Sequence, residues 1–162
     1  SKDKRSVGLL RGNGDMNLDK TDHAILRALV DDARISRAEL ARRVNLSAPA
    51  TGERVRRLEE AGVVTGYRAE IDYRRLGCTL TILIHARPLP GRMDEMARAM
   101  RESPQIEVCE RVSGENCYVA RAHVRGVEEM EAVIDRLMPF GATNTAIVQS
   151  VPVPSRLVGV DT

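Results

Sequence analysis

Residues 40–64 combine positive charge with small side chains. The run reads LARRVNLSAPATGERVRRLEEAGVV and has five arginines, which flank the small or polar residues SAPATG. Arginine guanidinium groups bind phosphate oxygens, and small side chains let a backbone approach another molecule closely. The pattern therefore indicates either a surface that contacts a phosphate backbone or an ordinary solvated helical face.

The distribution of charge favours the first alternative. The formal net charge of the 162-residue chain is only +2, yet Lys and Arg outnumber Asp and Glu by 16 to 12 in residues 1–77. In residues 78–162 they are outnumbered by 11 to 9. A basic front half and a mildly acidic back half predict different partners for the two halves.

Three helices are predicted in the front half. Residues 18–34 place Ile25, Leu26, Leu29 and Val30 on one helical face. Ser36 then caps a short helix RAELARRV, and Ser47 caps a helix that ends at Ala61. On a helical wheel Thr51, Val55 and Leu58 form the inner stripe of that last helix.

The segment VVTGYRAEI, after Gly62, predicts two short strands around Thr65-Gly66. Three helices followed by a hairpin describe a winged helix-turn-helix, whose second paired helix enters the major groove of DNA. Helix-turn-helix units also serve as protein-interaction modules, so this alternative stays open. The predicted DNA-binding residues are Arg37, Arg42, Arg43, Ser47, Ala48, Pro49, Thr51, Arg54, Arg56 and Arg57.

The back half predicts the order βαββαβ, which is the ferredoxin-like unit. Strands are expected from Thr79, over Ile106–Val112, over Cys117–Val124 and over residues 143–151, with helices at residues 92–103 and 127–138. Both helices should cover one face of the sheet. Apolar residues point to both faces, so a second copy is expected to cover the other face and form a dimer.

Catalysis, metal binding and a membrane location are not indicated. The chain has three cysteines, an odd number, and none of them are in a C-x-x-C motif. This usage is typical of a reduced, intracellular protein. No nucleophile-base pair, metal cluster or phosphate-binding glycine loop is present in the sequence, and no apolar run is long enough to span a membrane. We expect a cytoplasmic, non-enzymatic protein with no cofactor.

In these features the chain resembles the Lrp/AsnC family of feast/famine regulators. The resemblance covers about residues 17–154 and is carried by LDKTDHAILRALVDDARIS, AELARRVNLS, RVRRLEEAGVVTGYRAEID, VSGENCYV and TNTAIV. It implies a DNA-binding transcriptional regulator whose back domain binds a small effector, usually an amino acid, and whose dimers assemble further, often into octamers. An amino-acid sensor that acts through protein partners is the alternative.

The resemblance also implies an effector site near the loop SGEN. Asn116 stands where family members commonly have an aspartate, so a neutral carbonyl replaces a carboxylate. From the residues alone, Gly114 permits close backbone approach, although SGEN also fits a simple hairpin turn. The predicted effector-binding residues are Val112, Ser113, Gly114, Glu115, Asn116, Tyr118, Thr143 and Thr145.

The predicted organisation has five parts. These are a disordered lead-in (1–15), a DNA-binding domain (16–64), a wing and linker (65–77), an effector-binding and oligomerisation domain (78–153) and a tail (154–162).

Overall fold

The computed structural model describes residues 17–159, which divide into two compact units. One unit comprises residues 17–69 with 155–159, and the other comprises residues 70–154. The predicted lead-in and the last three residues of the predicted tail lie outside the described residues.

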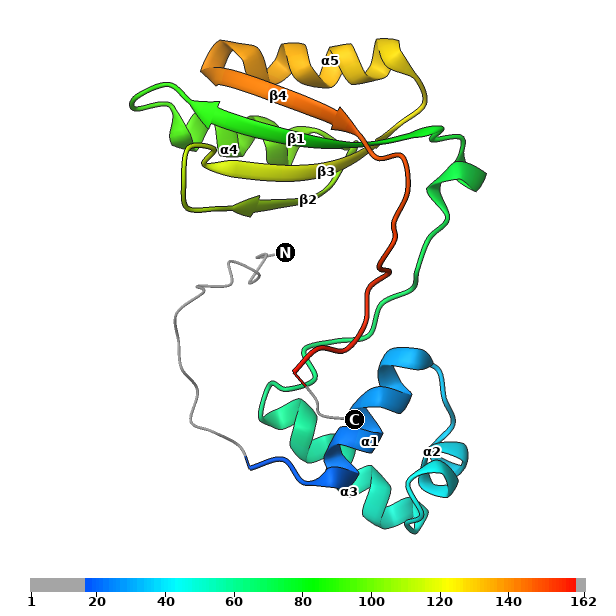
Figure 1. Ribbon diagram of the computed structural model, residues 1–162. Coiled ribbons are helices and arrows are strands. Elements are labelled where there is room, and N and C mark those ends of the chain that lie inside the picture. The colour runs from blue at the N-terminus through cyan, green and yellow to red at the C-terminus, as the bar shows by residue number, and fades with distance from the viewer. Residues whose placement is uncertain (1–16, 160–162) are drawn as a thin grey trace. The chain divides into compact units, whose positions relative to one another are not determined.

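The first unit contains α1 (Lys20–Asp31), α2 (Arg37–Arg43) and α3 (Ala48–Glu60) (Figure 1). The caps predicted at Ser36 and Ser47 are confirmed, because each hydroxyl accepts a hydrogen bond from a backbone N–H three residues later. α1 ends three residues before the predicted end. The Asp32 side chain accepts a hydrogen bond from the Arg34 N–H and turns the chain there.

The core of the first unit is made of apolar residues at helical spacing. Ile25 of α1 and Leu58 of α3 are fully buried, and Leu40 of α2 is nearly so. Leu157, from the predicted tail, packs against this same cluster. The C-terminal segment therefore contributes to the core of the first unit.

The two strands expected after α3 are absent from the structure. Residues 63–72, all of them described, contain no strand. The N–H groups of Val63 and Val64 both donate to the carbonyl of Leu58 and close the end of α3. Because these two donors are used at the helix end, Val63 and Val64 do not donate to a strand ladder.

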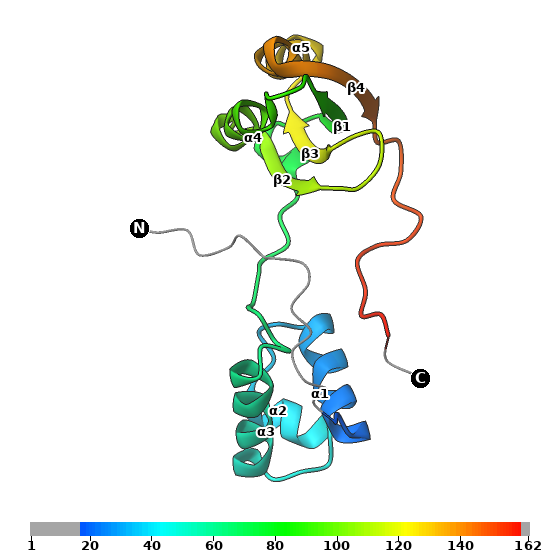
Figure 2. The ribbon, with the colours of Figure 1, turned by 90° about the vertical axis from the view of Figure 1, so that its left-hand side faces the viewer.

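The second unit is a four-stranded antiparallel sheet in the order β2-β3-β1-β4, with two helices on one face (Figure 2). This order and the βαββαβ sequence confirm the predicted ferredoxin-like class. Its elements are η1 (Tyr73–Leu76), β1 (Leu80–Pro88), α4 (Met93–Glu102), β2 (Ile106–Arg111), β3 (Tyr118–Val124), α5 (Val127–Leu137), η2 (Met138–Phe140) and β4 (Gly141–Ile147).

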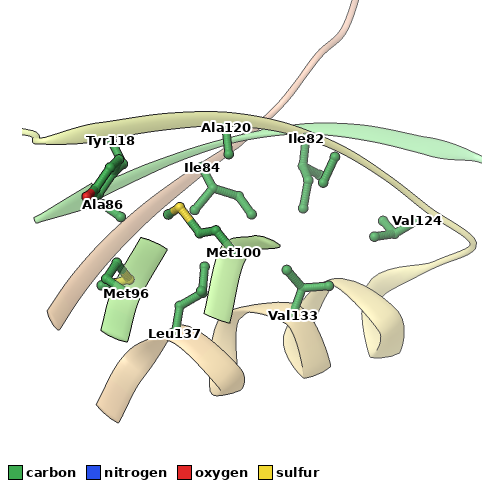
Figure 3. Close-up of a cluster of buried hydrophobic side chains, with 11 residues drawn as sticks. Ile82, Ile84, Ala86, Met96, Met100, Tyr118, Ala120, Val124, Val133 and Leu137 are labelled. Carbon is green, nitrogen blue, oxygen red and sulfur yellow. The ribbon is translucent and has the colours of Figure 1, made fainter. Parts of the chain in front are cut away.

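The core of the second unit lies between the sheet and α4 and α5 (Figure 3). Every second residue of β1 and β3 faces the helices, which is the period-two pattern of a half-buried strand. The facing helix residues include Met96, Met100 and Leu137, which are buried. The methionines are thus core residues, as their helical spacing indicates.

β4 starts two residues before the predicted strand and ends four residues before its predicted end. At its start, a Cβ on Gly141 would lie 2.2 Å from the carbonyl oxygen of Arg87 on β1. Glycine therefore permits the close approach of two backbones that lets β4 pair with the last residues of β1.

Candidate DNA-binding surface and ligand pocket

The first turn of α3 presents backbone and small side chains to solvent. Ala48, Pro49 and Ala50 are exposed, and the Ser47 hydroxyl caps the helix by accepting from the Ala50 N–H. Pro49 lies in the first turn, where its missing N–H costs nothing. The predicted approach surface is therefore present and exposed at the helix start.

Thr51 does not belong to this surface. Its side chain is fully buried, and its hydroxyl donates to the carbonyl of Ser47 at 2.9 Å. The assignment of Thr51 to DNA binding was wrong, because this residue is part of the inner stripe of α3.

Arg54 and Arg57 are tied to the start of α1. Arg54 Nη1 lies 2.8 Å from both Asp19 Oδ2 and Asp22 Oδ1, and Arg57 Nη2 lies 2.7 Å from Asp22 Oδ2. The Asp22 side chain is fully buried, so its charge needs these partners. Both arginines therefore hold α3 against α1, a role that the sequence prediction did not include.

The same carboxylates build the cap of α1. The Asp19 side chain accepts from the Asp22 N–H, and the Asp22 side chain accepts from the Asp19 N–H. The hydrogen bond from the Asp22 N–H lowers the pKa of Asp19, and the bond from Arg54 lowers it further. The cap of one helix and the position of another thus depend on one network.

The other predicted arginines of the helices are paired on the surface. Arg42 and Arg43 contact Glu39, and their hydrogen bonds lower the pKa of that carboxyl. Arg56 contacts Glu53 and Glu60 of its own helix. The arginines are exposed and Glu39 is only partly buried, and such ion pairs are weak, so the arginines can exchange partners.

Arg37 differs from the other predicted arginines. It is the exposed first residue of α2, and among the described residues it has no ion pair or side-chain hydrogen bond. Lys20, Arg34 and Arg68, which the sequence prediction did not select, share this property. Their charges are available for an anionic partner without loss of an internal contact.

In the second unit, a hollow of about 420 Å³ lies beside the loop between β2 and β3. The predicted residues Glu115, Asn116 and Thr143 line it, together with four residues that the prediction missed: His85, Arg87, Ala142 and Asn144. His85 and Arg87 alternate with the buried residues Ile84 and Ala86 along β1, so this strand pattern could have found them.

Three of the predicted effector residues lie on the side of the sheet that faces the helices: Thr143, Thr145 and Tyr118. Thr143 and Thr145 pair with Ala86 and Ile84, which face the helices, and directly paired residues share a face. Thr143 still borders the hollow. Thr145 does not, and its buried hydroxyl has no hydrogen-bond partner among the described residues.

Tyr118 belongs to the core. It is 8% exposed, and its hydroxyl donates to the Met93 carbonyl at 3.3 Å. Burial raises its pKa. The prediction that Tyr118 contacts the effector was wrong, since β3 turns this side chain towards α4.

The loop itself is held from both ends. The Val112 N–H donates to the Cys117 carbonyl, and the Cys117 N–H donates to the Ala86 carbonyl on β1. The N–H groups of residues 113–116 form no hydrogen bond with any described residue. Gly114 has φ +109°, a conformation that favours glycine.

Residues 17–159 contain neither a metal-ligand cluster nor a membrane-spanning helix. No group of three or more His, Cys, Asp or Glu side chains in this range is placed to hold a metal ion. No helix in the same range is long and apolar enough to cross a membrane.

Comparisons with known proteins address both units. Residues 18–65 match the family model described as winged helix-turn-helix DNA-binding, and residues 79–158 match the Lrp/AsnC ligand binding domain. The HTH-type transcriptional regulator LrpC of Bacillus subtilis is 32% identical over 135 residues, which are 83% of this chain and 94% of that protein. The leucine-responsive regulatory protein of Salmonella typhimurium is 32% identical and covers 88% and 92% respectively.

Solved structures agree with these matches. The structure of Bacillus subtilis LrpC has a TM-score of 0.81 at 31% identity and covers 86% of this chain and all of that chain. A Neisseria meningitidis regulator in complex with L-Met has a TM-score of 0.80 at 26% identity, covering 85% and 94%. A feast or famine regulatory protein of Mycobacterium tuberculosis, complexed with L-methionine, has a TM-score of 0.78 at 32% identity, covering 86% and 97%.

Proposed function

The chain belongs to the Lrp/AsnC family of transcriptional regulators, and on this basis we propose that the start of α3 binds specific DNA sequences. The exposed, small-residue first turn of α3 carries this proposal. A helix end with no bulky side chain can lie close to base edges in the major groove. Regulation, rather than catalysis, is the proposed role.

Phosphate contacts would come from arginines on α2 and α3. Arg37 has no internal partner among the described residues, and the partners of Arg42, Arg43 and Arg56 are exposed or only partly buried. Exchanging an exposed carboxylate for a phosphate costs little. Arg54 and Arg57 contribute to binding mainly by positioning α3, because their guanidinium groups hold Asp22.

Substitution of Ala50 by Glu tests this surface. A glutamate three residues after Ser47 completes a capping box, so Ala50→Glu should preserve the helix while it adds bulk and negative charge at the DNA-facing turn. The measurement is fluorescence anisotropy of the full chain with duplex DNA from upstream of its own gene, against a scrambled duplex.

We expect at least a tenfold loss of specific affinity for Ala50→Glu. Ala132→Glu, at an exposed position of α5, is the matched control because it makes the same change of net charge. Its affinity should stay within threefold of wild type. Wild-type affinity for Ala50→Glu would show that the start of α3 does not face DNA.

The ligand that modulates this binding is proposed to be a free amino acid. Two related structures contain L-methionine, and the hollow beside residues 113–116 lies in the matched ligand-binding domain. The unsatisfied N–H groups of that loop can receive a carboxylate. The test is the same anisotropy titration with each of the twenty amino acids added; specific DNA binding unaffected by all of them would reject this part of the proposal.

A homodimer, assembling further into an octamer, is the proposed state in the cytoplasm. The sheet face opposite the helices includes the half-buried side chains of Leu83 and Val119, and η1 reaches its His123 end, where the Tyr73 ring stacks on the imidazole. A second copy would bury this face and would present two copies of α3 to two half-sites on DNA. Light scattering of the full chain measures the assembly, and a monomer would refute it.

A further inference from the structure

A second hollow, of about 510 Å³, lies on the helix side of the second unit. Five residues of α4 and its C-terminal end line this helix-side hollow, together with Arg136 of α5 and Phe140 of η2. None of its lining residues lines the hollow beside residues 113–116, so the two are separate. Its volume is in the range of small-molecule pockets, about 300–1,000 Å³.

The elements around the helix-side hollow are held in place by the fold. Arg98, Ala99, Glu102 and Ser103 follow one another at steps of one, three and four residues, so they share one face of α4. On the other side, the Leu89 N–H donates to the carbonyl of Phe140 at 2.8 Å and fixes η2. The walls of the hollow are therefore formed before any ligand binds.

The helix-side hollow has an excess of one positive charge. Glu95 is paired with Arg92 at 2.8 Å, so its carboxylate is already neutralised. Arg98, Arg136 and Glu102 form no hydrogen bond or ion pair with any residue in the described range 17–159. Two unpaired guanidinium groups thus face one unpaired carboxylate, which favours a ligand with a single negative charge.

The remaining lining residues offer apolar surface. Ala99 and Phe140 are half-buried, and Ser103 is 2% exposed. The Ser103 hydroxyl donates to the Ala99 carbonyl at 2.8 Å, so its proton is not available to an anion. The side-chain donors left for a ligand are those of the two arginines, and the surface beside them suits a hydrocarbon group.

We propose that the helix-side hollow binds a small organic monocarboxylate with an apolar body. The guanidinium groups of Arg98 and Arg136 bind the carboxylate, because their planar donors match its two oxygens. The apolar body packs against Ala99 and Phe140. A zwitterion has no net charge and would leave the excess positive charge uncompensated, so the site selects against it. This inference goes beyond the proposed function and does not depend on it.

Isothermal titration calorimetry on the full chain tests the assignment with two probes, benzoate and 4-methylpentanoate. Benzamide and 4-methylpentanamide keep the apolar body but lack the charge, and acetate keeps the charge but lacks the body. The wild type should bind both probes, and the three analogues should each bind about tenfold more weakly. Equal binding of a probe and its amide would overturn the assignment of the arginines.

Three variants locate the site. Arg98→Ala and Arg136→Ala should each weaken both probes about tenfold, because each removes one charged donor group. Ala99→Leu fills the hollow without a change of charge and should abolish binding. Arg101→Ala is the matched control, since Arg101 is an exposed arginine of α4 that does not line the hollow; it should bind like wild type. The urea midpoint of each variant shows whether the second unit stays folded.

Failure of this inference differs from failure of the proposed function. If the wild type binds neither probe at millimolar concentration, or if the two arginine variants and Ala99→Leu bind both probes as the wild type does, the helix-side hollow is not a carboxylate site. DNA binding and its response to amino acids are measured separately and stand in either case. Conversely, a chain that fails to bind specific DNA can still bind benzoate at Arg98 and Arg136.

Discussion

Removal of Arg54 and Arg57 together should loosen the first unit before it affects any phosphate contact. Asp22 is 0% exposed and has two charged partners, Arg54 and Arg57, besides the Asp19 N–H. Without both arginines the buried Asp22 carboxyl group loses its two charged partners, which costs about 3–5 kcal/mol. Arg57→Ala alone should cost about 1–2 kcal/mol, because Arg54 still contacts Asp22 and Arg57 is half exposed.

Hydrogen exchange measured by mass spectrometry reports this loss locally. A loss of about 3–5 kcal/mol corresponds to a hundred- to several-thousand-fold decrease in protection of the amides of α1 and α3 in the double variant. Peptides from residues 80–147 provide an internal reference, because they belong to the other unit. Arg56→Ala is the matched control on α3, since its partners Glu53 and Glu60 are exposed, and it should change protection less than threefold.

A third substitution isolates the charge as the cause. Adding Asp22→Asn to the double variant removes the unpaired buried charge, so protection should rise rather than fall. Protection of α1 and α3 within threefold of wild type in the double variant would refute the reasoning. It would mean that the Asp22 network does not hold these two helices together.

Three further measurements test other parts of the structure. Arg37→Ala should weaken binding to all DNA sequences and reduce the slope of log affinity against log salt by about 1, measured by anisotropy between 50 and 200 mM salt; an unchanged slope would exclude a phosphate contact. The pKa values of Asp19, Glu39 and Glu53 are lowered, so their stabilisation should be complete above the ordinary values of 3.8 and 4.5 and should be lost as pH falls below them; equal urea stability of the first unit at pH 6 and pH 3 would contradict this. Gly141→Ala should destabilise the second unit by about 1–3 kcal/mol or more, because its Cβ would lie 2.2 Å from the Arg87 carbonyl oxygen; a wild-type urea midpoint would mean that β1 and β4 separate readily.

The helices of the first unit were predictable because their signals are local. Ser36 and Ser47 accept hydrogen bonds three residues away, a distance that a sequence pattern specifies. The partners of Arg54 and Arg57 lie 32 to 35 residues away, on a helix whose orientation the sequence does not give. The burial of Asp22 could not be predicted from the sequence either, because a charged residue at a helix start usually faces solvent.

Around the ligand pocket, the alternation of residues along a strand predicts the face of each side chain for β3 but not for β4. In β3 the apolar residues Ala120, Ala122 and Val124 alternate with polar ones, and the same phase places Tyr118 in the core, so the sequence contained that information. In β4 small and polar residues occupy both phases, so Thr143 and Thr145 could be predicted to share a face but not which face. Arg87 and Glu115 come together only through the register of β1 with β3 and the closed loop.

The packing of Leu157 into the first unit has a topological consequence. The polypeptide leaves the first unit after residue 69 and returns to it at residue 155, so the second unit is inserted within the first rather than appended to it. A single proteolytic cut in residues 66–72 would thus break the covalent link between the three helices and the C-terminal segment that carries Leu157. After such a cut, only noncovalent contacts such as that of Leu157, a partly buried side chain that contributes about 1–2 kcal/mol, would hold the C-terminal segment against the three helices.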